Sequence, residues 1–347
     1  MGLDTETATV DILLLETLIP EAMAWLSARH SLSFRPELAH DPRALAHSTN
    51  DCRAILLPRS VMVTQNFLDL APKLEAVARL HAGSDNTDLE ACRERGVRVV
   101  QAQSANVRSN AEFLLAALLM MYRRGFITAL MGKKDYQLQI GREINGSTVG
   151  ILGLSPTAHT LAALLNGLGA RVIGYDPAMH HTSPLWSNLR VQPVSLLEMM
   201  SSADAVSVQM PYASRFKGFI NDNVLGAVKP GQKWVAISRS ALFDADALAR
   251  ALHDGRIEGC LLDGVEKDFL KPDSPLLAAK NLYMTPRIGS FTAEARVRAG
   301  WYVAHRLHDA LSTGIGSTAP MLLDLPGTVI TQSQWGDSSS NSTPPAG

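Results

Sequence analysis

The sequence predicts an α/β protein built on two parallel sheets, each covered by helices. Short apolar runs, typical of buried strands, alternate with amphipathic stretches, typical of helices, along most of the chain. A second series of strands and helices begins near Ser147, which predicts two doubly wound units. The chain has 347 residues, 46% of them hydrophobic, enough for two domains with cores of their own.

The first unit is predicted from short apolar runs that end at turn residues. Strands are expected at 10–15, 54–58, 74–80 and 97–100, and a helix at 20–28. From 106 to 124, apolar side chains recur with helical spacing, which predicts a long helix in the core or at a dimer interface.

The second unit repeats this pattern with longer apolar runs. Strands are expected at 149–153, 170–176, 205–209, 234–237 and 259–262, and helices at 157–167 and 293–311. The tail from 328 to 347 is rich in Ser, Thr, Gly and Pro and is expected to be disordered.

Composition narrows the classes of partner. The net charge of −1 and the absence of a basic run argue against nucleic acid and membrane surfaces, and no apolar run is long enough to span a bilayer. The three cysteines form no CxxC or Cys/His cluster, and the amino terminus does not resemble a signal peptide. We therefore expect a cytoplasmic protein with no metal site that binds a small soluble molecule.

A glycine-rich turn follows the first strand of the second unit. Strand, turn, helix and an acid about 20 residues on form the Rossmann dinucleotide fingerprint. Gly153 occupies the first glycine position, whereas Ser155 replaces the second, and Pro156 before Thr157 removes one backbone N–H from the start of the helix. Asp176 would hydrogen-bond the adenosine ribose and repel a 2′-phosphate, which favours NAD over NADP. The alternative is a Rossmann unit that keeps the fold but binds the cofactor weakly.

Several further motifs, in order along about 200 residues, make the chain resemble the D-isomer-specific 2-hydroxyacid dehydrogenases. The resemblance covers roughly residues 8 to 325. The motifs are His81-Ala82-Gly83-Ser84-Asp85-Asn86-Thr87-Asp88, Asn106-Val107-Arg108-Ser109-Asn110-Ala111-Glu112, Lys229-Pro230-Gly231, Ser238-Arg239, Leu262-Asp263 and Thr285-Pro286.

The resemblance implies a Rossmann-like cofactor domain inserted into a substrate domain. The substrate domain would comprise residues 1–105 and 296–327, and the NAD-binding domain residues 106–295. Members of this family are usually homodimers that pair largely through the cofactor domain.

The resemblance also implies roles for individual residues. Arg239 matches the arginine that binds the substrate carboxylate and polarises the keto oxygen, which suits a planar fork of donors. Asp263 matches the residue near the nicotinamide carboxamide, and Ser238 and Pro211 are further expected cofactor contacts. Ala82, Gly83 and Ser84 match the loop whose backbone N–H groups hold the substrate carboxylate, and His81 sits on this loop, where the family usually has a small residue.

Arg287 departs from the pattern, because it stands where the family has its catalytic histidine. An arginine stays protonated and cannot act as a general acid. Asp268 stands where the family has the glutamate that pairs with that histidine, so we expect an Arg287–Asp268 ion pair. The pair would be either a structural clamp or a second anion-binding group beside Arg239, suited to a dianionic ligand. His81 is an alternative proton donor.

We therefore expect an NAD(H)-dependent oxidoreductase that interconverts a 2-keto acid and a 2-hydroxy acid, with an atypical active site. One alternative is a catalytically impaired protein that binds NAD or a carboxylate as a sensor. Another is an enzyme with lyase-like or isomerase-like chemistry in the same cleft.

Overall fold

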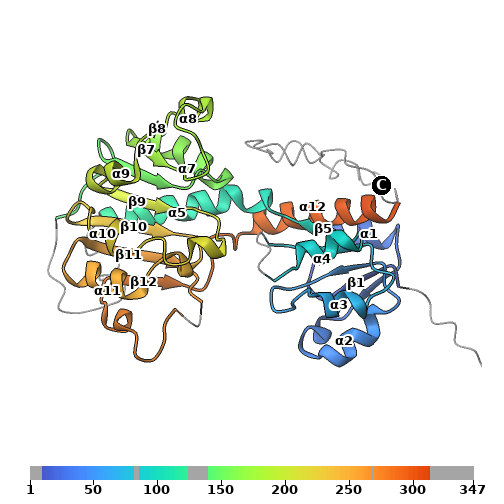
Figure 1. The fold of residues 1–347 in the computed structure, drawn as a ribbon. Coiled ribbons are helices and arrows are strands. Elements are labelled where there is room, and N and C mark those ends of the chain that lie inside the picture. The colour runs from blue at the N-terminus through green and yellow to red at the C-terminus, as the bar shows by residue number, and fades with distance from the viewer. Residues whose placement is uncertain (1–9, 82–85, 124–139, 267–268, 313–347) are drawn as a thin grey trace, which may run out of the picture.

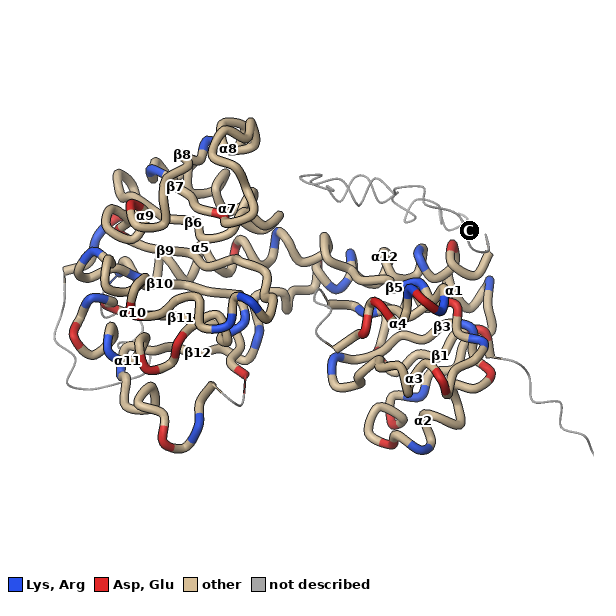
Figure 2. Tube along the Cα trace, in the orientation of Figure 1, with Lys and Arg blue, Asp and Glu red and all other residues tan. Residues whose placement is uncertain are grey.

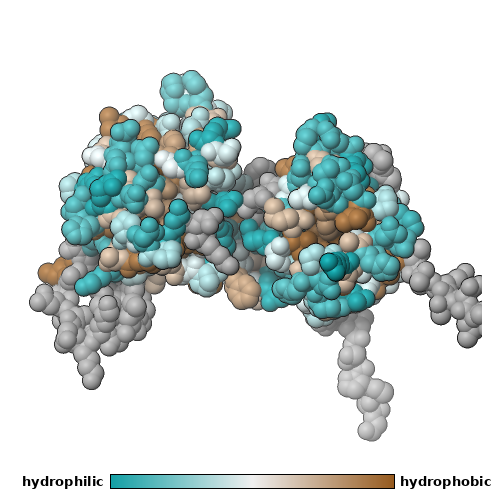
Figure 3. All heavy atoms as spheres, turned by 60° about the horizontal axis from the view of Figure 1, so that its bottom comes forward, coloured by the Kyte–Doolittle hydropathy of each residue, from teal (hydrophilic) through white to brown (hydrophobic). Residues whose placement is uncertain are grey.

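The chain folds into two lobes, each built on a parallel sheet (Figure 1). The structure is a computed structural model that describes residues 10–81, 86–123, 140–266 and 269–312. Figure 3 shows that the surface is hollowed between the two lobes. The predicted fold class, two doubly wound parallel sheets, is confirmed.

The first lobe holds a five-stranded sheet in the order β2-β1-β3-β4-β5. Its strands are β1 (Ile12–Leu14), β2 (Leu32–Phe34), β3 (Ala54–Leu56), β4 (Ala76–Arg79) and β5 (Arg98–Gln101). Alternate side chains of these strands enter two separate cores. One core packs under α1 (Pro20–Ser27) and α12 (Ala293–Ser312), and the other under α2 (Pro42–Thr49), α3 (Gln65–Asp69) and α4 (Leu89–Glu94).

The second lobe holds a seven-stranded sheet in the order β12-β11-β10-β9-β6-β7-β8. Its strands are β6 (Thr148–Leu152), β7 (Arg171–Tyr175), β8 (Gln192–Pro193), β9 (Ala205–Val208), β10 (Gln232–Ala236), β11 (Ile257–Asp263) and β12 (Leu282–Thr285). Its helices are α5 (Val107–Tyr122), α7 (Pro156–Gly167), α8 (Pro184–Asn188), α9 (Leu196–Ser202), α10 (Asp222–Leu225) and α11 (Ala245–His253).

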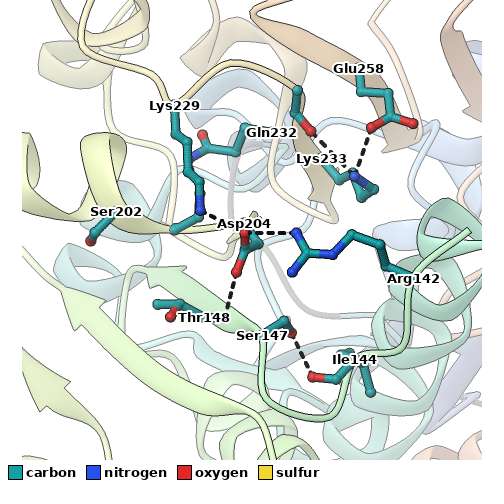
Figure 4. Close-up of polar contacts among 12 residues, drawn as sticks. Arg142, Ile144, Ser147, Thr148, Ser202, Asp204, Lys229, Gln232, Lys233 and Glu258 are labelled. Carbon is teal, nitrogen blue, oxygen red and sulfur yellow. Dashed lines mark hydrogen bonds and ion pairs between the residues drawn. The ribbon is translucent and has the colours of Figure 1, made fainter.

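One partly buried carboxylate links the amino ends of the second lobe's central strands (Figure 4). Asp204, just before β9, accepts hydrogen bonds from the Thr148 backbone N–H at 2.9 Å, from Lys229 Nζ at 2.7 Å and from Arg142 Nη1 at 3.2 Å. Burial would raise the pKa of Asp204, but these donors lower it below its ordinary value. These bonds hold the amino-terminal ends of β6, β9 and β10 together, and the loops discussed below follow the carboxyl-terminal ends of the strands.

Helix α5 lies along the second lobe and α12 along the first, and the two begin close together at the junction of the lobes (Figure 1). They meet where the Ser109 and Thr292 hydroxyls lie 2.7 Å apart, and Arg298 Nε donates to the Ala105 carbonyl at 2.9 Å. This junction lies close to the two domain boundaries, 105/106 and 295/296, that we expect from the sequence.

Every strand and helix expected from the sequence within the described residues is present, with ends shifted by a few residues. The sequence did not predict three strands, and each of them is an edge strand. β2 lies at one edge of the first sheet, and β8 and β12 lie at the two edges of the second. The tail predicted to be disordered lies outside the described residues.

Candidate active site

The expected cofactor and catalytic residues of the second lobe gather at the carboxyl edge of its sheet. All strand pairs in this sheet are parallel, so the segments that follow the strands meet at one edge. The strand order reverses between β6 and β9, which is where open sheets of this type bind ligands. Figure 2 shows Lys and Arg segments gathered near the ends of β10, β11 and β12 that face the other lobe.

The glycine-rich turn keeps its shape despite its changed sequence. Gly153 has a φ of +93°, and a Cβ added there would lie 2.6 Å from the backbone nitrogen of Met210, so only glycine fits. Ser155 caps α7 by accepting from the Ala158 N–H at 3.3 Å, and its hydroxyl donates to Gln209 at 3.2 Å. Pro156 is the first residue of α7. The helix end therefore offers a phosphate fewer N–H groups than an all-glycine turn.

Asp176 lies directly after β7 and holds the same turn. Its Oδ2 accepts from the Leu154 N–H at 2.6 Å and its Oδ1 from the Ala178 N–H at 2.8 Å. Each carboxylate oxygen has a second lone pair, so both can also accept from ribose hydroxyls. The turn, the helix start and this carboxylate together fit a dinucleotide.

The ends of β9 and β10 are joined through a buried serine. Ser238 Oγ lies 3.2 Å from the Val208 carbonyl and 2.9 Å from the Met210 carbonyl. Its hydroxyl is therefore oriented toward the protein interior. Pro211, the next residue along this connection, is exposed at the sheet edge.

Asp263, at the end of β11, shapes the segment that follows β12. Its carboxylate accepts from Thr285 Oγ1 at 2.7 Å and from the backbone N–H groups of Ile288 at 2.7 Å and Gly289 at 2.8 Å. The segment that carries Arg287 is wrapped around this side chain.

Arg287 is held in an unusual backbone conformation. Its φ is +57°, in the left-handed region that non-glycine residues rarely adopt. Its side chain lies across Gly264, whose φ is +89°, and a Cβ added to Gly264 would lie 1.9 Å from Arg287 Cγ. Arg287 is therefore fixed in place by its own backbone and by the absence of a side chain at Gly264.

Two arginines share one carboxylate, and we call these three residues the Arg–Glu–Arg cluster. Glu266 Oε1 accepts from Arg287 Nη2 at 2.6 Å and from Arg239 Nε at 3.0 Å. The other oxygen accepts from the Ser240 N–H at 2.9 Å and from its hydroxyl. The Arg239 guanidinium also lies 4.8 Å from the Tyr212 ring centre. Burial would raise the pKa of Glu266, but the bonds from Ser240 and Arg239 and the charge of Arg287 lower it, so the carboxylate stays ionised.

The sequence did not identify Glu266 as a site residue. Asp268, the partner expected for Arg287, lies outside the described residues, so that ion pair stays a prediction. The sequence could have suggested Glu266, because it is an acidic residue only two positions before Asp268 in the same loop.

On the first lobe, the expected substrate loop is described only in part. Ala82 and Gly83 lie outside the described residues, and His81 is partly buried just after β4. The buried Arg79 braces both sides of this loop by donating to Pro58 O at 2.9 Å, Val61 O at 3.0 Å, Asn86 O at 2.8 Å and Thr87 Oγ1 at 2.9 Å. Sequence reasoning did not single out Arg79.

Among the described residues, no three His, Cys, Asp or Glu side chains are grouped so that they would hold a metal ion. No helix in the same ranges is both long and apolar enough to cross a membrane.

The chain matches one family model and many known proteins. The model for the D-isomer specific 2-hydroxyacid dehydrogenase NAD binding domain matches residues 115–289. The (S)-sulfolactate dehydrogenase of Chromohalobacter salexigens is 31% identical over 304 residues, which is 87% of this chain and 98% of that one. The D-3-phosphoglycerate dehydrogenase of Mycobacterium leprae is 33% identical over 84% of this chain, which spans 55% of that protein.

Solved structures agree with this assignment. The TT0316 protein of Thermus thermophilus aligns over 87% of this chain and 97% of its own, with 26% identity and a TM-score of 0.75. A glyoxylate reductase from Paecilomyes thermophila aligns over 88% of this chain with a TM-score of 0.75 at 22% identity, a likeness of fold.

Proposed function

The chain belongs to the D-isomer-specific 2-hydroxyacid dehydrogenases, and we propose that it interconverts a 2-keto acid and a 2-hydroxy acid without a histidine general acid. The observation that carries this proposal is the Arg–Glu–Arg cluster. It places two permanent cations at the same sheet edge as the dinucleotide turn.

We propose NAD(H) as the cofactor, in preference to NADP(H). The pyrophosphate would lie at the start of α7 beside Gly153, and the adenosine ribose at Asp176, whose negative charge disfavours a 2′-phosphate. When bound, the nicotinamide supplies or accepts the hydride. The Asp263 carboxylate would lie near its carboxamide while it holds the 285–289 segment.

The protein's own residues would bind the acid and stabilise charge. Arg239 would bind the substrate carboxylate and polarise the keto oxygen, because its planar guanidinium matches a carboxylate. Arg287 would add positive charge where oxygen becomes negative, but it has no proton to give at working pH. The proton would come from water or from His81 on the facing loop. Loss of a general acid typically costs about 10²–10⁴ in rate, so we expect slow turnover.

The test is NADH oxidation with a panel of 2-keto acids for the natural protein, for Arg287→His and for Arg239→Gln. We expect weak activity in the natural protein, a gain in Arg287→His and a loss in Arg239→Gln. Turnover by the natural protein that Arg287→His does not exceed would contradict the argument that the acid is missing.

The main alternative is a protein that binds the cofactor or a carboxylate without turnover. It is favoured by the turn at Ser155 and Pro156, which has fewer phosphate-binding N–H groups than an all-glycine turn. Thermal-shift measurements with NAD+ and with NADP+ test whether the protein binds either cofactor, because a ligand that binds the folded state must raise its melting temperature. No stabilisation by millimolar NAD+ would contradict every cofactor-dependent function.

We further propose a cytoplasmic homodimer. The buried, unbonded thiols of Cys52, Cys92 and Cys260 suit a reducing compartment. Leu119 on α5 and Leu168 beside α7 are each 40% exposed on helices that pack together, which suits pairing through the cofactor domain. Light scattering on the purified protein tests the dimer; a monomeric mass at micromolar concentration contradicts it.

A further inference from the structure

We propose that the hydroxyl of Ser155 competes with the pyrophosphate of the cofactor for the start of α7, so that this one oxygen sets the affinity of the cofactor site. The inference rests on the proposed function, since it concerns the same dinucleotide site. It starts from one contact: Ser155 Oγ accepts a hydrogen bond from the Ala158 backbone N–H at 3.3 Å.

The turn has few backbone donors to offer a phosphate. An anion at a helix start binds through the N–H groups of the first turn, which the helix itself does not use. The Leu154 N–H already donates to Asp176 Oδ2 at 2.6 Å, and Pro156, the first residue of α7, has no N–H. Ala158, the third residue of α7, therefore carries one of the donors that a pyrophosphate needs, and Ser155 occupies it.

Gln209 fixes which side of the hydroxyl is turned toward the phosphate position. Ser155 Oγ donates to Gln209 Oε1 at 3.2 Å, and the Gln209 side-chain nitrogen donates to Ser207 Oγ at 3.3 Å, which orients the amide. A hydroxyl has a single proton, so Ser155 presents lone pairs, not a donor, to the helix start. Turning that proton to a phosphate would cost Gln209, which is only 4% exposed, a hydrogen bond to its buried oxygen.

The bound pyrophosphate and the Ser155 cap therefore exclude each other. The dinucleotide binds the form in which the Ala158 N–H has left Ser155, and its apparent Kd rises in proportion to the scarcity of that form. From the usual strength of an N-terminal serine cap, we expect a penalty of about 2- to 30-fold in Kd. Removing the hydroxyl should recover this factor.

The test is calorimetric titration with NAD+ and with ADP-ribose, which has the pyrophosphate but no nicotinamide. The variants are Ser155→Ala, which keeps the Cβ, and Ser155→Gly, which removes it. The control is Thr64→Ala, because Thr64 Oγ1 caps α3 of the first lobe by accepting from the Phe67 N–H at the same distance of 3.3 Å.

Both ligands should bind about 2- to 30-fold more tightly to Ser155→Ala than to the natural protein, and at least as tightly to Ser155→Gly. Thr64→Ala should leave both affinities unchanged. Without ligand, Ser155→Ala and Thr64→Ala should both lower Tm, since each removes a helix cap. A lower Tm combined with tighter binding is an outcome that a purely structural role of Ser155 does not produce.

Tightening in Ser155→Gly but not in Ser155→Ala would make the Cβ the obstacle and overturn the inference. Weaker binding in Ser155→Ala would make the hydroxyl a phosphate ligand and overturn it as well. Turnover of a 2-keto acid with equal cofactor affinity in all variants would leave the proposed function standing and refute the competition. Tighter binding by Ser155→Ala without turnover of any 2-keto acid would do the reverse.

Discussion

Replacing Gly264 with alanine should displace Arg287 and so test how the cluster is built. The new Cβ would lie 1.9 Å from Arg287 Cγ and 2.7 Å from its Nε, distances that no rearrangement of a methyl group relieves. Arg287 must therefore leave its position and give up its contact with Glu266. The backbone of Gly264, at φ +89°, adds strain for any residue with a Cβ.

The magnitude follows from these two contributions. A left-handed backbone costs an alanine about 1–2 kcal/mol. The Arg287–Glu266 contact adds about 1 kcal/mol or less, because the arginine is 37% exposed and solvent screens the pair. We expect Gly264→Ala to cost about 1–3 kcal/mol in the free energy of unfolding. The contact alone should lower Tm by about 2–4 °C for a domain of this size.

Gly255→Ala is the matched control. Gly255 has a similar φ of +77°, but nothing lies within 4 Å of an added Cβ, so this variant has the strain without the clash. Calorimetric melting should rank Gly264→Ala below Gly255→Ala. In an Arg287→Ala background, the two alanines should cost the same. If the extra cost of Gly264→Ala persists without the arginine side chain, the proposed contact between Gly264 and Arg287 is not its cause.

Three further outcomes concern stability and pH. Asp204→Asn should lower the free energy of unfolding by about 1–3 kcal/mol, because it removes the charged partner of Lys229. The pKa of Asp204 is lowered in the folded state, so in the natural protein its stabilising contribution should fade as pH falls below about 4. Urea unfolding midpoints measure both effects. His30 Nε2 lies 2.9 Å from His308 Nδ1, and burial together with the charge of His308 lowers the pKa of His30. Tm should therefore fall as pH drops below about 6.5, and it should fall less steeply in His30→Gln. Parallel plots of Tm against pH for the two proteins would contradict this expectation. Burial raises the pKa of Glu16, whose Oε2 is buried without a hydrogen-bond partner in the described structure, so its ionisation destabilises the fold as pH rises above about 4.5. Glu16→Gln should therefore raise the free energy of unfolding at pH 8 by about 1 kcal/mol. A lower free energy of unfolding in this variant would show that the carboxylate has a favourable partner.

The fold was predictable because its central strands are buried on both faces. Such strands appear as continuous apolar runs, as in β1, β3, β6 and β9. The strands missed by the sequence lie at or next to sheet edges, where one side is open and the run is short or mixed. β8 has only two residues and contains Pro193, and the apolar run of β12 is short and only half-buried.

The site was predictable only where a motif fixes a position along the chain. Arg239 and Arg287 follow strand ends, and parallel strands bring those ends together whatever the loops do. Glu266 lies in a loop without periodicity, and its role depends on where its side chain turns. Gly264 matters because of what it lacks beside a residue more than twenty positions away, which no local pattern reports.

Several neighbours hold Arg287, which we propose stands where the family has its catalytic histidine. A planar imidazole needs no bare backbone beneath it, whereas the longer arginine lies across Gly264 and requires a left-handed backbone of its own. The carboxylate that it reaches in the described structure is Glu266, which Ser240 and Arg239 hold ionised. On the proposed match of Arg287 with the family's acid, a cation is fixed at that position, and a fixed cation would serve binding and charge stabilisation rather than proton transfer.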